Sequence, residues 1–301
     1  MKKKVLVLFS GGLDSRLVIR FFKEKDFDVT ALYFNLPFGC NSSLGEIDSF
    51  VKEEDISLKI VDVREEPYLK SYLEVLKKPK FGYGTSFNPC SDCKVWMFKV
   101  AKEIYEKEKF DIVASGEVLG QRPMSQTNKK RNLIDGEIGF DILRPLSGKL
   151  LPETTYEKKG LIKREEMFDI EGRRRIKQLE LAKKWKIKYP NPSGGCLLCE
   201  RAYKKRFEYL IKKNILNSEN LILTKIGRAF LIEDIFYVVA RNSYEGEILM
   251  KFEKNIILGD KGIPTVYFSK EQGFEKVKEL QKVFSKGVSE EKRSEFDKFK
   301  L

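Results

Sequence analysis

The chain has 301 residues, carries 58 lysine and arginine residues against 45 aspartate and glutamate residues, and contains no histidine. Without histidine there is no Ser-His-Asp or Cys-His nucleophile, no HExxH zinc site and no imidazole base, so any proton transfer uses carboxylate, lysine, tyrosine, cysteine or water. A hydrophobic fraction of 42% excludes a disordered chain. The net charge of +13 favours a polyanionic partner, although a Lys- and Glu-rich composition is also typical of thermophiles.

The N-terminal part of the chain alternates strand and helix patterns. Strands are expected at residues 4–9, 28–34, 58–63 and 111–115, and helices at 16–25, 47–54 and 94–107. This alternation predicts an α/β fold, in which a doubly wound parallel sheet has right-handed crossovers. The functional site of such a fold lies at the carboxyl ends of the strands.

No segment resembles a signal peptide or a membrane span. The apolar run Val5–Phe9 stops at a glycine turn, whereas a signal peptide needs about 7–15 apolar residues and a membrane helix about 20. We therefore expect a cytoplasmic protein whose cysteines stay reduced.

The pattern changes after about residue 150. The basic segment 158–188 is expected to be helical, and prolines and glycines then interrupt the chain. Short β-runs are expected between residues 221 and 268, and one charged helix with a frayed end over 270–301. The sequence thus predicts a catalytic domain at 1–210 and a smaller α+β domain at 211–301.

Two glycines and two serines mark a phosphate-binding loop between the first strand and the first helix. The segment Ser10–Ser15 reads SGGLDS. Its glycines let the backbone approach an anion, and the helix N-terminus supplies free N–H groups and a positive dipole end. The loop contains no lysine, so it is not of the GxxxxGK[ST] type.

The SGGLDS motif resembles the pyrophosphate-binding loop of the N-type ATP pyrophosphatase (PP-loop) superfamily, and the chain is similar to its tRNA thiolation enzymes over most of residues 1–210. The supporting segments are ALYFNLPF (31–38), NPCSDCK (88–94), SGEVLGQRPMSQ (115–126), DILRPLSGKLLPET (141–154), GRRRIKQLELAKK (172–184) and PSGGCLLCE (192–200). The resemblance implies an adenine nucleotide alpha hydrolase-like fold. It also implies that Mg²⁺·ATP binds at Ser10, Gly11, Gly12, Asp14, Ser15, Phe34, Gly116, Gln121 and Arg122.

Within that site the resemblance implies that Asp14 has a catalytic role in positioning Mg²⁺ and that residues 116–126 face the nucleotide. Some thiolation enzymes carry a histidine near this segment. The present chain lacks it, so a role that depends on it does not transfer.

Four of the five cysteines form two CxxC pairs, Cys90/Cys93 and Cys196/Cys199. A CxxC turn can point two thiolates at one metal ion, so the pairs are compatible with four-sulfur zinc, with an iron–sulfur cluster, or with a persulfide resolved through a disulfide. The similarity to cluster-dependent thiolation enzymes favours a 4Fe-4S cluster over Zn²⁺. It also favours Cys90, Cys93 and Cys196 as ligands, because relatives often lack a cysteine at the position of Cys199, here a possible fourth ligand.

The similarity to thiolation enzymes also makes Cys90 and Cys196 catalytic candidates in sulfur transfer. The lone Cys40 follows the second strand, at the edge that faces the site. It is interpreted as a packing thiol or as a participant in sulfur transfer.

Arginines mark two candidate RNA contacts. Arg173, Arg174 and Arg175 form a cationic cluster that can bind tRNA phosphates, while Arg122 or Arg144 can reach ATP or the substrate. Residues 225–249 resemble the RNA-binding domain of NFACT proteins, which implies RNA contacts at Arg228 and Arg241. The alternative for the arginine cluster is a solvated helix without a partner, and the alternative for the C-terminal domain is a small capping domain without a ligand.

These features together predict an ATP-dependent tRNA sulfurtransferase, with tRNA, ATP and a sulfur donor (sulfide, a persulfide or a carrier protein) as its partners. The first alternative is a PP-loop enzyme on a small molecule, similar to deazapurine nitrile synthases and holding structural zinc. The second is a non-catalytic RNA-binding or sulfur-carrier protein, which the intact SGGLDS loop disfavours.

Overall fold

The computed structural model describes residues 2–39, 44–190, 196–252 and 254–301. They form two compact units, residues 1–200 and residues 201–301, which are described separately. None of the described helices is both long enough and apolar enough to span a bilayer. Cys40 lies outside the described residues, so its predicted role stays open.

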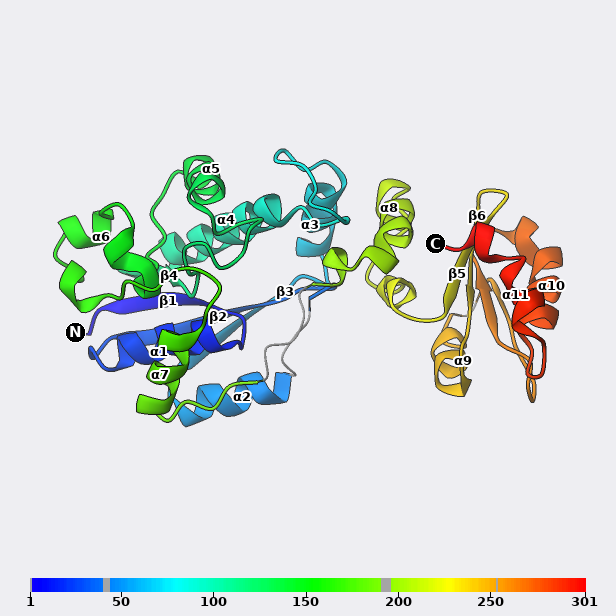
Figure 1. The fold of residues 1–301 in the computed structure, drawn as a ribbon, viewed down its shortest axis with the longest axis horizontal. Coiled ribbons are helices and arrows are strands. Elements are labelled where there is room, and N and C mark those ends of the chain that lie inside the picture. The colour runs from blue at the N-terminus through cyan, green and yellow to red at the C-terminus, as the bar shows by residue number, and fades with distance from the viewer. Residues whose placement is uncertain (1, 40–43, 191–195, 253) are drawn as a thin grey trace. The chain divides into compact units, whose positions relative to one another are not determined.

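The first unit is built on a four-stranded parallel sheet in the order β3-β2-β1-β4 (Figure 1). Its strands are β1 (Lys4–Phe9), β2 (Asp28–Asn35), β3 (Ser57–Asp62) and β4 (Ile112–Ser115). Its helices are α1 (Leu13–Lys23), α2 (Leu44–Glu53), α3 (Tyr68–Lys77), α4 (Cys90–Glu108), α5 (Asn128–Ile138), α6 (Thr155–Lys158) and α7 (Ile176–Lys184).

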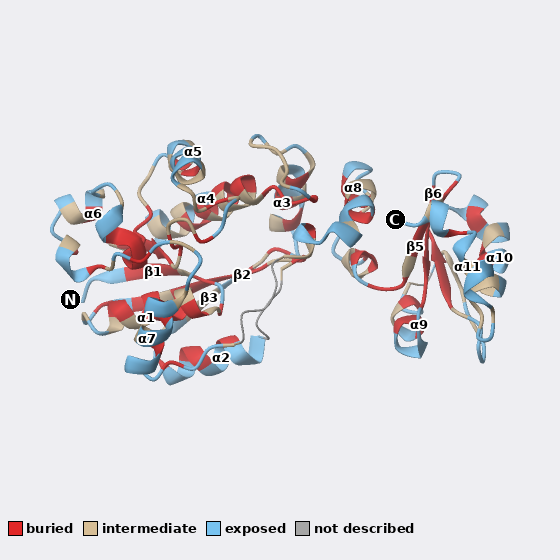
Figure 2. Cartoon of the chain, viewed as in Figure 1, coloured by how far each residue is buried: buried red, intermediate tan, exposed pale blue. Residues whose placement is uncertain are grey.

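Figure 1 shows α1, α2 and α7 on one face of this sheet and α3, α4 and α5 on the other. The arrangement confirms the predicted doubly wound α/β class. The strands β1, β2 and β4 are almost entirely buried (Figure 2), which is why they read as continuous apolar runs. Val5 and Val7 of β1 pack in one core cluster with Leu17 and Phe21 of α1.

The basic segment is less helical than its sequence predicts. Only α7 and short turns form between residues 158 and 188. Gly160 and Gly172 have φ angles of +68° and +79°, a left-handed conformation that ends a helix. The helices α3 and α5 were not predicted.

The second unit holds an antiparallel sheet in the order β5-β6-β8-β7. Its strands are β5 (Arg228–Ile232), β6 (Ile235–Val239), β7 (Ile256–Ile257) and β8 (Val266–Phe268), and its helices are α8 (Lys204–Lys212), α9 (Ser243–Leu249), α10 (Phe274–Phe284) and α11 (Glu290–Ser294). This confirms the smaller α+β part of the predicted fold class.

Three β or tail predictions in this unit are wrong. Residues 221–224 form a 3₁₀ turn. The apolar run 247–252 is expected as a strand, but residues 247–249 form the end of α9. That helix starts because the Asn242 side chain accepts a hydrogen bond from the Glu245 amide. The tail does not fray, since Phe296 is buried and the Leu301 amide donates to the Ala229 carbonyl.

Candidate functional site

The SGGLDS loop joins the carboxyl end of β1 to the first turn of α1. The Ser15 hydroxyl donates to the Gly12 carbonyl at 3.0 Å, and the Ser10 and Ser15 hydroxyls are 3.3 Å apart. The buried Arg16 side chain donates to the Gly11 carbonyl at 2.8 Å. Within the described chain no side chain caps α1, so its first N–H groups remain available to an anion.

The segment after β4 lies directly against this loop. A Cβ added at Gly116 would be 2.7 Å from the Ser15 backbone nitrogen, which is too close for any side chain. Glycine is therefore required at this position by the approach of two backbones. The structure thus brings Gly116 together with the loop residues, as the sequence predicts.

Asp14 is held by amide side chains. The Gln121 amide donates to Asp14 Oδ2 at 2.8 Å, while Asp14 Oδ1 is buried with no hydrogen-bond partner among the described residues. Burial raises the pKa of Asp14, and Gln121, Arg175, Gln178 and Arg122 oppose that rise. A partly buried carboxylate in which one oxygen has no hydrogen-bond partner is suited to binding a cation.

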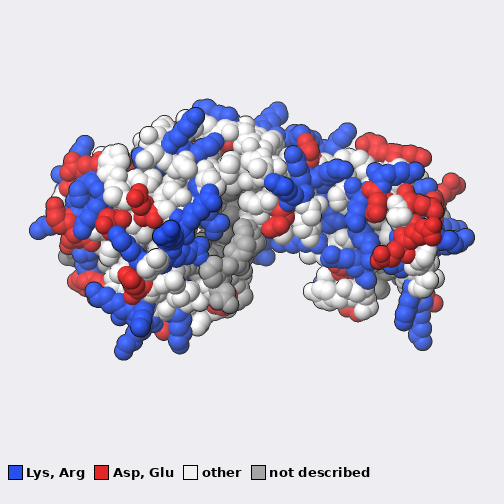
Figure 3. Space-filling view, in the orientation of Figure 1, with Lys and Arg blue, Asp and Glu red and all other residues white. Residues whose placement is uncertain are grey.

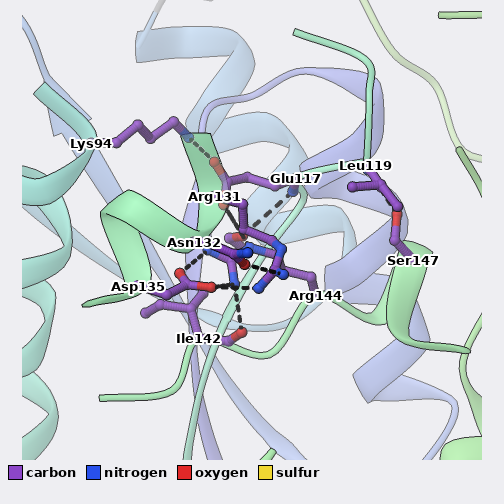
Figure 4. A network of polar contacts seen from close by, with 10 residues as sticks. Lys94, Glu117, Leu119, Arg131, Asn132, Asp135, Ile142, Arg144 and Ser147 are labelled. Atoms are coloured by element: carbon purple, nitrogen blue, oxygen red, sulfur yellow. Dashed lines mark hydrogen bonds and ion pairs between the residues drawn. The ribbon is translucent and has the colours of Figure 1, made fainter. Parts of the chain in front are cut away.

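A second network of polar contacts braces the same segment (Figure 4). The buried Glu117 carboxylate accepts from Arg144 Nε at 2.8 Å and forms an ion pair with Lys94 Nζ at 3.2 Å. Arg144 also binds Asp135, which pairs with Arg131 on the same helix. Burial alone would raise the pKa of Glu117, but Lys94 and Arg144 outweigh it and the pKa is lowered.

Arg144 is therefore occupied within the protein, so the prediction that it might reach ATP or the substrate is replaced by a bracing role. Its side chain is 6% exposed and is bonded to two carboxylates. Arg122 differs, because its side chain is exposed and makes no hydrogen bond or ion pair within the described part of the chain.

The described cysteines come from two segments. Cys90 and Cys93 occupy the first turn of α4, and a 3₁₀ turn spans Leu197–Cys199. The Tyr72 hydroxyl and Cys93 Sγ are 3.4 Å apart, and Cys196 Sγ donates to the Phe38 carbonyl at 3.0 Å. A hydrogen bond joins Cys90 to Cys199, so the two CxxC pairs meet.

The thiols have divergent acidities. The hydrogen bond from Cys199, helped by Asn88, Lys94 and Arg122, lowers the pKa of Cys90 to about 6. Burial raises the pKa of Cys93 to about 11, and the bond to Cys90 raises the pKa of Cys199. The lowered pKa of Cys90 favours its thiolate, the form that binds metals and attacks sulfur.

The thiols are near one another but are not arranged around one point. Within the described ranges, no group of three or more Cys, Asp or Glu side chains could hold a metal ion as it stands. The donor set itself fits a thiolate-bound metal or cluster, since it offers four sulfurs and no imidazole. Binding would require the thiols to move together.

Arg122 has a minor electrostatic effect on both the loop and the thiols. Its charge opposes the rise in the pKa of Asp14 and helps to lower the pKa of Cys90. Phe34, predicted to bind ATP, is only 7% exposed, and its ring lies edge-on to Trp96 at 6.0 Å. Little of this ring is available to an adenine.

The arginines before α7 border a cavity of about 520 Å³. Arg173 and Arg174 line it opposite Thr127 and Asn128 at the start of α5. Arg175 instead precedes α7 and acts on Asp14. Figure 3 shows basic side chains spread over the visible face of both units, with acidic side chains between them.

The arginines predicted in the second unit have internal partners. Arg241 pairs with the buried Glu245, and the Arg228 guanidinium lies 5.5 Å from the centre of the Phe284 ring. Arg206 is buried and donates to the Ile226 and Gly227 carbonyls. The predicted role of Arg228 and Arg241 in RNA binding stays a prediction.

Sequence reasoning missed four residues that support the loop: Arg16, Lys94, Glu117 and Gln178. One of them was detectable. Gln178 and Ala182 are the two buried residues of α7 and are one helical turn apart. A glutamine in the buried stripe of an amphipathic helix signals a specific polar partner.

Known proteins match parts of the chain. Argininosuccinate synthase of Bacillus cytotoxicus is 40% identical over 70 residues, or 22% of this chain and 16% of that protein. The enzyme of Bacillus mycoides is 29% identical over 150 residues, or 48% of this chain and 33% of that protein. The chain therefore spans well under half the length of these curated relatives.

Two solved structures show weaker likeness. A predicted subunit of a tRNA methyltransferase from Methanocaldococcus jannaschii has 21% identity and a TM-score of 0.34, over 48% of this chain and 70% of that one. A 4-thiouridine synthetase in complex with RNA and bound ATP has 18% identity and a TM-score of 0.39, over 73% of this chain and 53% of that one.

A protein-family model also matches the N-terminal half of the chain. The profile of the thiamine biosynthesis protein (ThiI) covers residues 1–153, which include the SGGLDS loop, the first CxxC pair and the segment after β4. Because this match covers more than half of the chain, the chain belongs to the ThiI family.

Proposed function

We propose that this protein is an ATP-dependent tRNA sulfurtransferase. A nucleobase oxygen attacks the α-phosphate of ATP, pyrophosphate leaves, and a sulfur nucleophile then displaces AMP from the adenylated base. Adenylation is needed because a carbonyl oxygen is a poor leaving group. Membership of the ThiI family supports ATP use at the loop.

The observation that carries the proposal is that one segment, residues 115–126, is bonded both to the phosphate loop and to the turn of the first CxxC pair. The Gln121 amide donates to Asp14 Oδ2 at 2.8 Å, and the hydroxyl of Ser91, which lies between Cys90 and Cys93, donates to the Met124 carbonyl at 2.9 Å. A base activated at the loop would therefore be close to a sulfur held at the thiols. The α1 N-terminus would bind the phosphates, and Asp14 Oδ1 would hold Mg²⁺, which would neutralise phosphate charge.

Cys90, Cys93 and Cys196 would hold a 4Fe-4S cluster, with Cys199 as a possible fourth ligand or as the hydrogen-bond donor it is to Cys90 here. When bound with three cysteines, such a cluster supplies an iron able to carry sulfide. The same thiols also suit zinc, which would leave sulfur delivery to a cysteine persulfide.

The RNA would bind through phosphate contacts at two places. Arg173 and Arg174 are exposed beside the cavity, and their positive charge suits the RNA backbone. We also propose that residues 201–301 act as an NFACT-type RNA-binding domain, in which Arg228 and Arg241 contribute positive charge. A cytoplasmic location accords with this function.

The decisive experiment starts with anaerobic purification, metal analysis and a visible spectrum. About four irons per chain, lost in Cys196→Ser and kept in the matched Cys199→Ser variant, would support three-cysteine ligation. One zinc per chain without visible absorption would overturn the cluster assignment.

Activity is then tested with tRNA, ATP, Mg²⁺ and sulfide. Nucleosides from digested tRNA should contain a thio-base, and AMP should form only when tRNA is present. AMP formation with a free small molecule and without tRNA would overturn the proposed substrate and favour the small-molecule enzyme.

A further inference from the structure

Gln178 is a fully buried amide on the inner face of α7. Its side chain has an exposed fraction of 0%, and α7 packs against α1, the helix that follows the phosphate loop. Nearby inward-facing residues of α7 and its end, such as Ala182 and Trp185, belong to or pack on the apolar core. A glutamine at this position costs desolvation that a methionine of similar length would avoid.

The amide connects α7 to Asp14 by two hydrogen bonds. Gln178 Nε2 donates to Gln121 Oε1 at 3.2 Å, and Gln121 Nε2 donates to Asp14 Oδ2 at 2.8 Å. An amide has an acceptor end and a donor end. Because Gln178 occupies the acceptor end of Gln121, the donor end of Gln121 is directed at Asp14.

The network is incomplete within the protein. Asp14 Oδ1 and Gln178 Oε1 are both buried without a hydrogen-bond partner among the described residues. A network that served only packing would be expected to satisfy these atoms, because each unpaired buried oxygen costs about 1–3 kcal/mol. The unpaired Asp14 oxygen instead suits a ligand that is not part of the chain.

We propose that Gln178 is a positioning residue: it fixes the orientation of the Gln121 amide, which in turn holds the Asp14 carboxylate with Oδ1 directed to the Mg²⁺ of bound Mg²⁺·ATP. This inference rests on the proposed ATP site. It adds a residue from α7, the helix that follows the arginine cluster, to the machinery of the loop.

The first test is an NMR measurement that needs no activity. The chain has five glutamines, so selective ¹⁵N-glutamine labelling gives five side-chain amide pairs. In Gln178→Met the Gln121 pair should shift and lose its protection against hydrogen exchange, because its acceptor partner is gone. The matched control is Leu179→Met, a change on the exposed side of the same helix.

The second test is Mg²⁺·ATP binding by calorimetry. Gln178→Met should raise the dissociation constant by about tenfold or more, the range for hydrogen bonds to charged groups. In a Gln121→Met background the same change should have a clearly smaller effect, because Gln178 acts mainly through Gln121 and only its direct influence on Asp14 remains. Leu179→Met should bind as the wild type does.

An unchanged Gln121 amide pair in Gln178→Met, or fully additive losses in the double variant, would overturn the proposal. Emission from Trp185, the residue that ends α7, checks that the helix stays docked. If Gln178→Met does not fold, Gln178→Glu replaces it, since a carboxylate in that place repels Gln121 Oε1 and should turn the amide over. A wild type that does not bind ATP would refute the proposed function, while the NMR result would still decide the orientation of Gln121.

Discussion

Removing Arg144 should destabilise the first unit strongly. Arg144 is 6% exposed and its Nε is 2.8 Å from the carboxylate of Glu117, which is itself 5% exposed. Replacement by methionine keeps much of the volume but leaves a buried carboxylate short of one partner. Breaking a buried ion pair in this way costs about 3–5 kcal/mol.

The structure places the expected loss at the lower end of that range. Glu117 keeps Lys94 at 3.2 Å, and Asp135 is partly exposed and keeps Arg131 at 2.8 Å. We therefore expect Arg144→Met to lower the free energy of unfolding by about 3 kcal/mol. The double variant Glu117→Gln/Arg144→Met should recover most of the loss, because it leaves no uncompensated charge.

Urea unfolding followed by tryptophan fluorescence measures this effect in the right unit. The chain has two tryptophans, and Trp96 and Trp185 both belong to residues 1–200. Lys177→Met is the control: it breaks a surface pair of 2.8 Å with Asp169, and no measurable loss is expected. The reasoning is refuted if Arg144→Met loses less than about 1 kcal/mol, or if the double variant is no more stable than the single one.

Three further outcomes are expected. Because the folded-state pKa of Glu117 is lowered, the stability that its ionised carboxylate contributes is fully present above the ordinary value of 4.5 and is lost as the pH falls through the lower folded value. Urea midpoints measured from pH 7 to pH 3 should show this loss of stability, and the variant Glu117→Gln/Arg144→Met should not show the part that comes from Glu117. Gly116→Ala should weaken Mg²⁺·ATP binding by about tenfold or more in calorimetry, a loss of about 1.4 kcal/mol, whereas Gly136→Ala, with open space around its added Cβ, should bind normally. Phe296→Ala should destabilise the second unit by about 3 kcal/mol, since Phe296 is 5% exposed, and amide exchange in β5 should accelerate; unchanged exchange would contradict the packed tail.

The strands β1, β2 and β4 could be predicted because burial on both faces makes each of them an apolar run, whereas the edge strand β3 is mostly exposed or half-buried. Val5–Val7 and Ile112–Ala114 are completely buried, so no polar residue interrupts their pattern. The place of the SGGLDS loop in the fold could be predicted from the strand that precedes it, because a loop at the carboxyl end of a parallel strand lies at the sheet edge where ligands bind.

Helix α5 was missed because its apolar pattern is weak. Only Ile134 and Ile138 of its eleven residues are buried. The clearest local signal was Thr127, whose side chain accepts a hydrogen bond from the Lys130 amide. The prediction of a strand at residues 247–252 failed for the opposite reason, since an apolar run at the end of a short helix has the composition of a strand.

The polar networks were beyond prediction because their partners are distant in sequence. Glu117 and Arg144 are 27 residues apart, Gln121 and Gln178 are 57 apart, and Asp14 and Gln121 are 107 apart. Local propensity carries no information on such pairs. A buried polar residue in an apolar stripe shows that a partner exists, but the fold is needed to identify it.

The two networks meet on one short segment, and this explains why that segment can serve both halves of the site. Glu117 ties it to Lys94, the residue after Cys93 on the helix that begins with the first CxxC pair. Gln121 ties it to Asp14 in the phosphate loop, and the next residue is Arg122. A displacement of α4 by a metal or cluster would therefore pull on the residues that hold Asp14. Nucleotide affinity should consequently differ between the metal-loaded and metal-free protein.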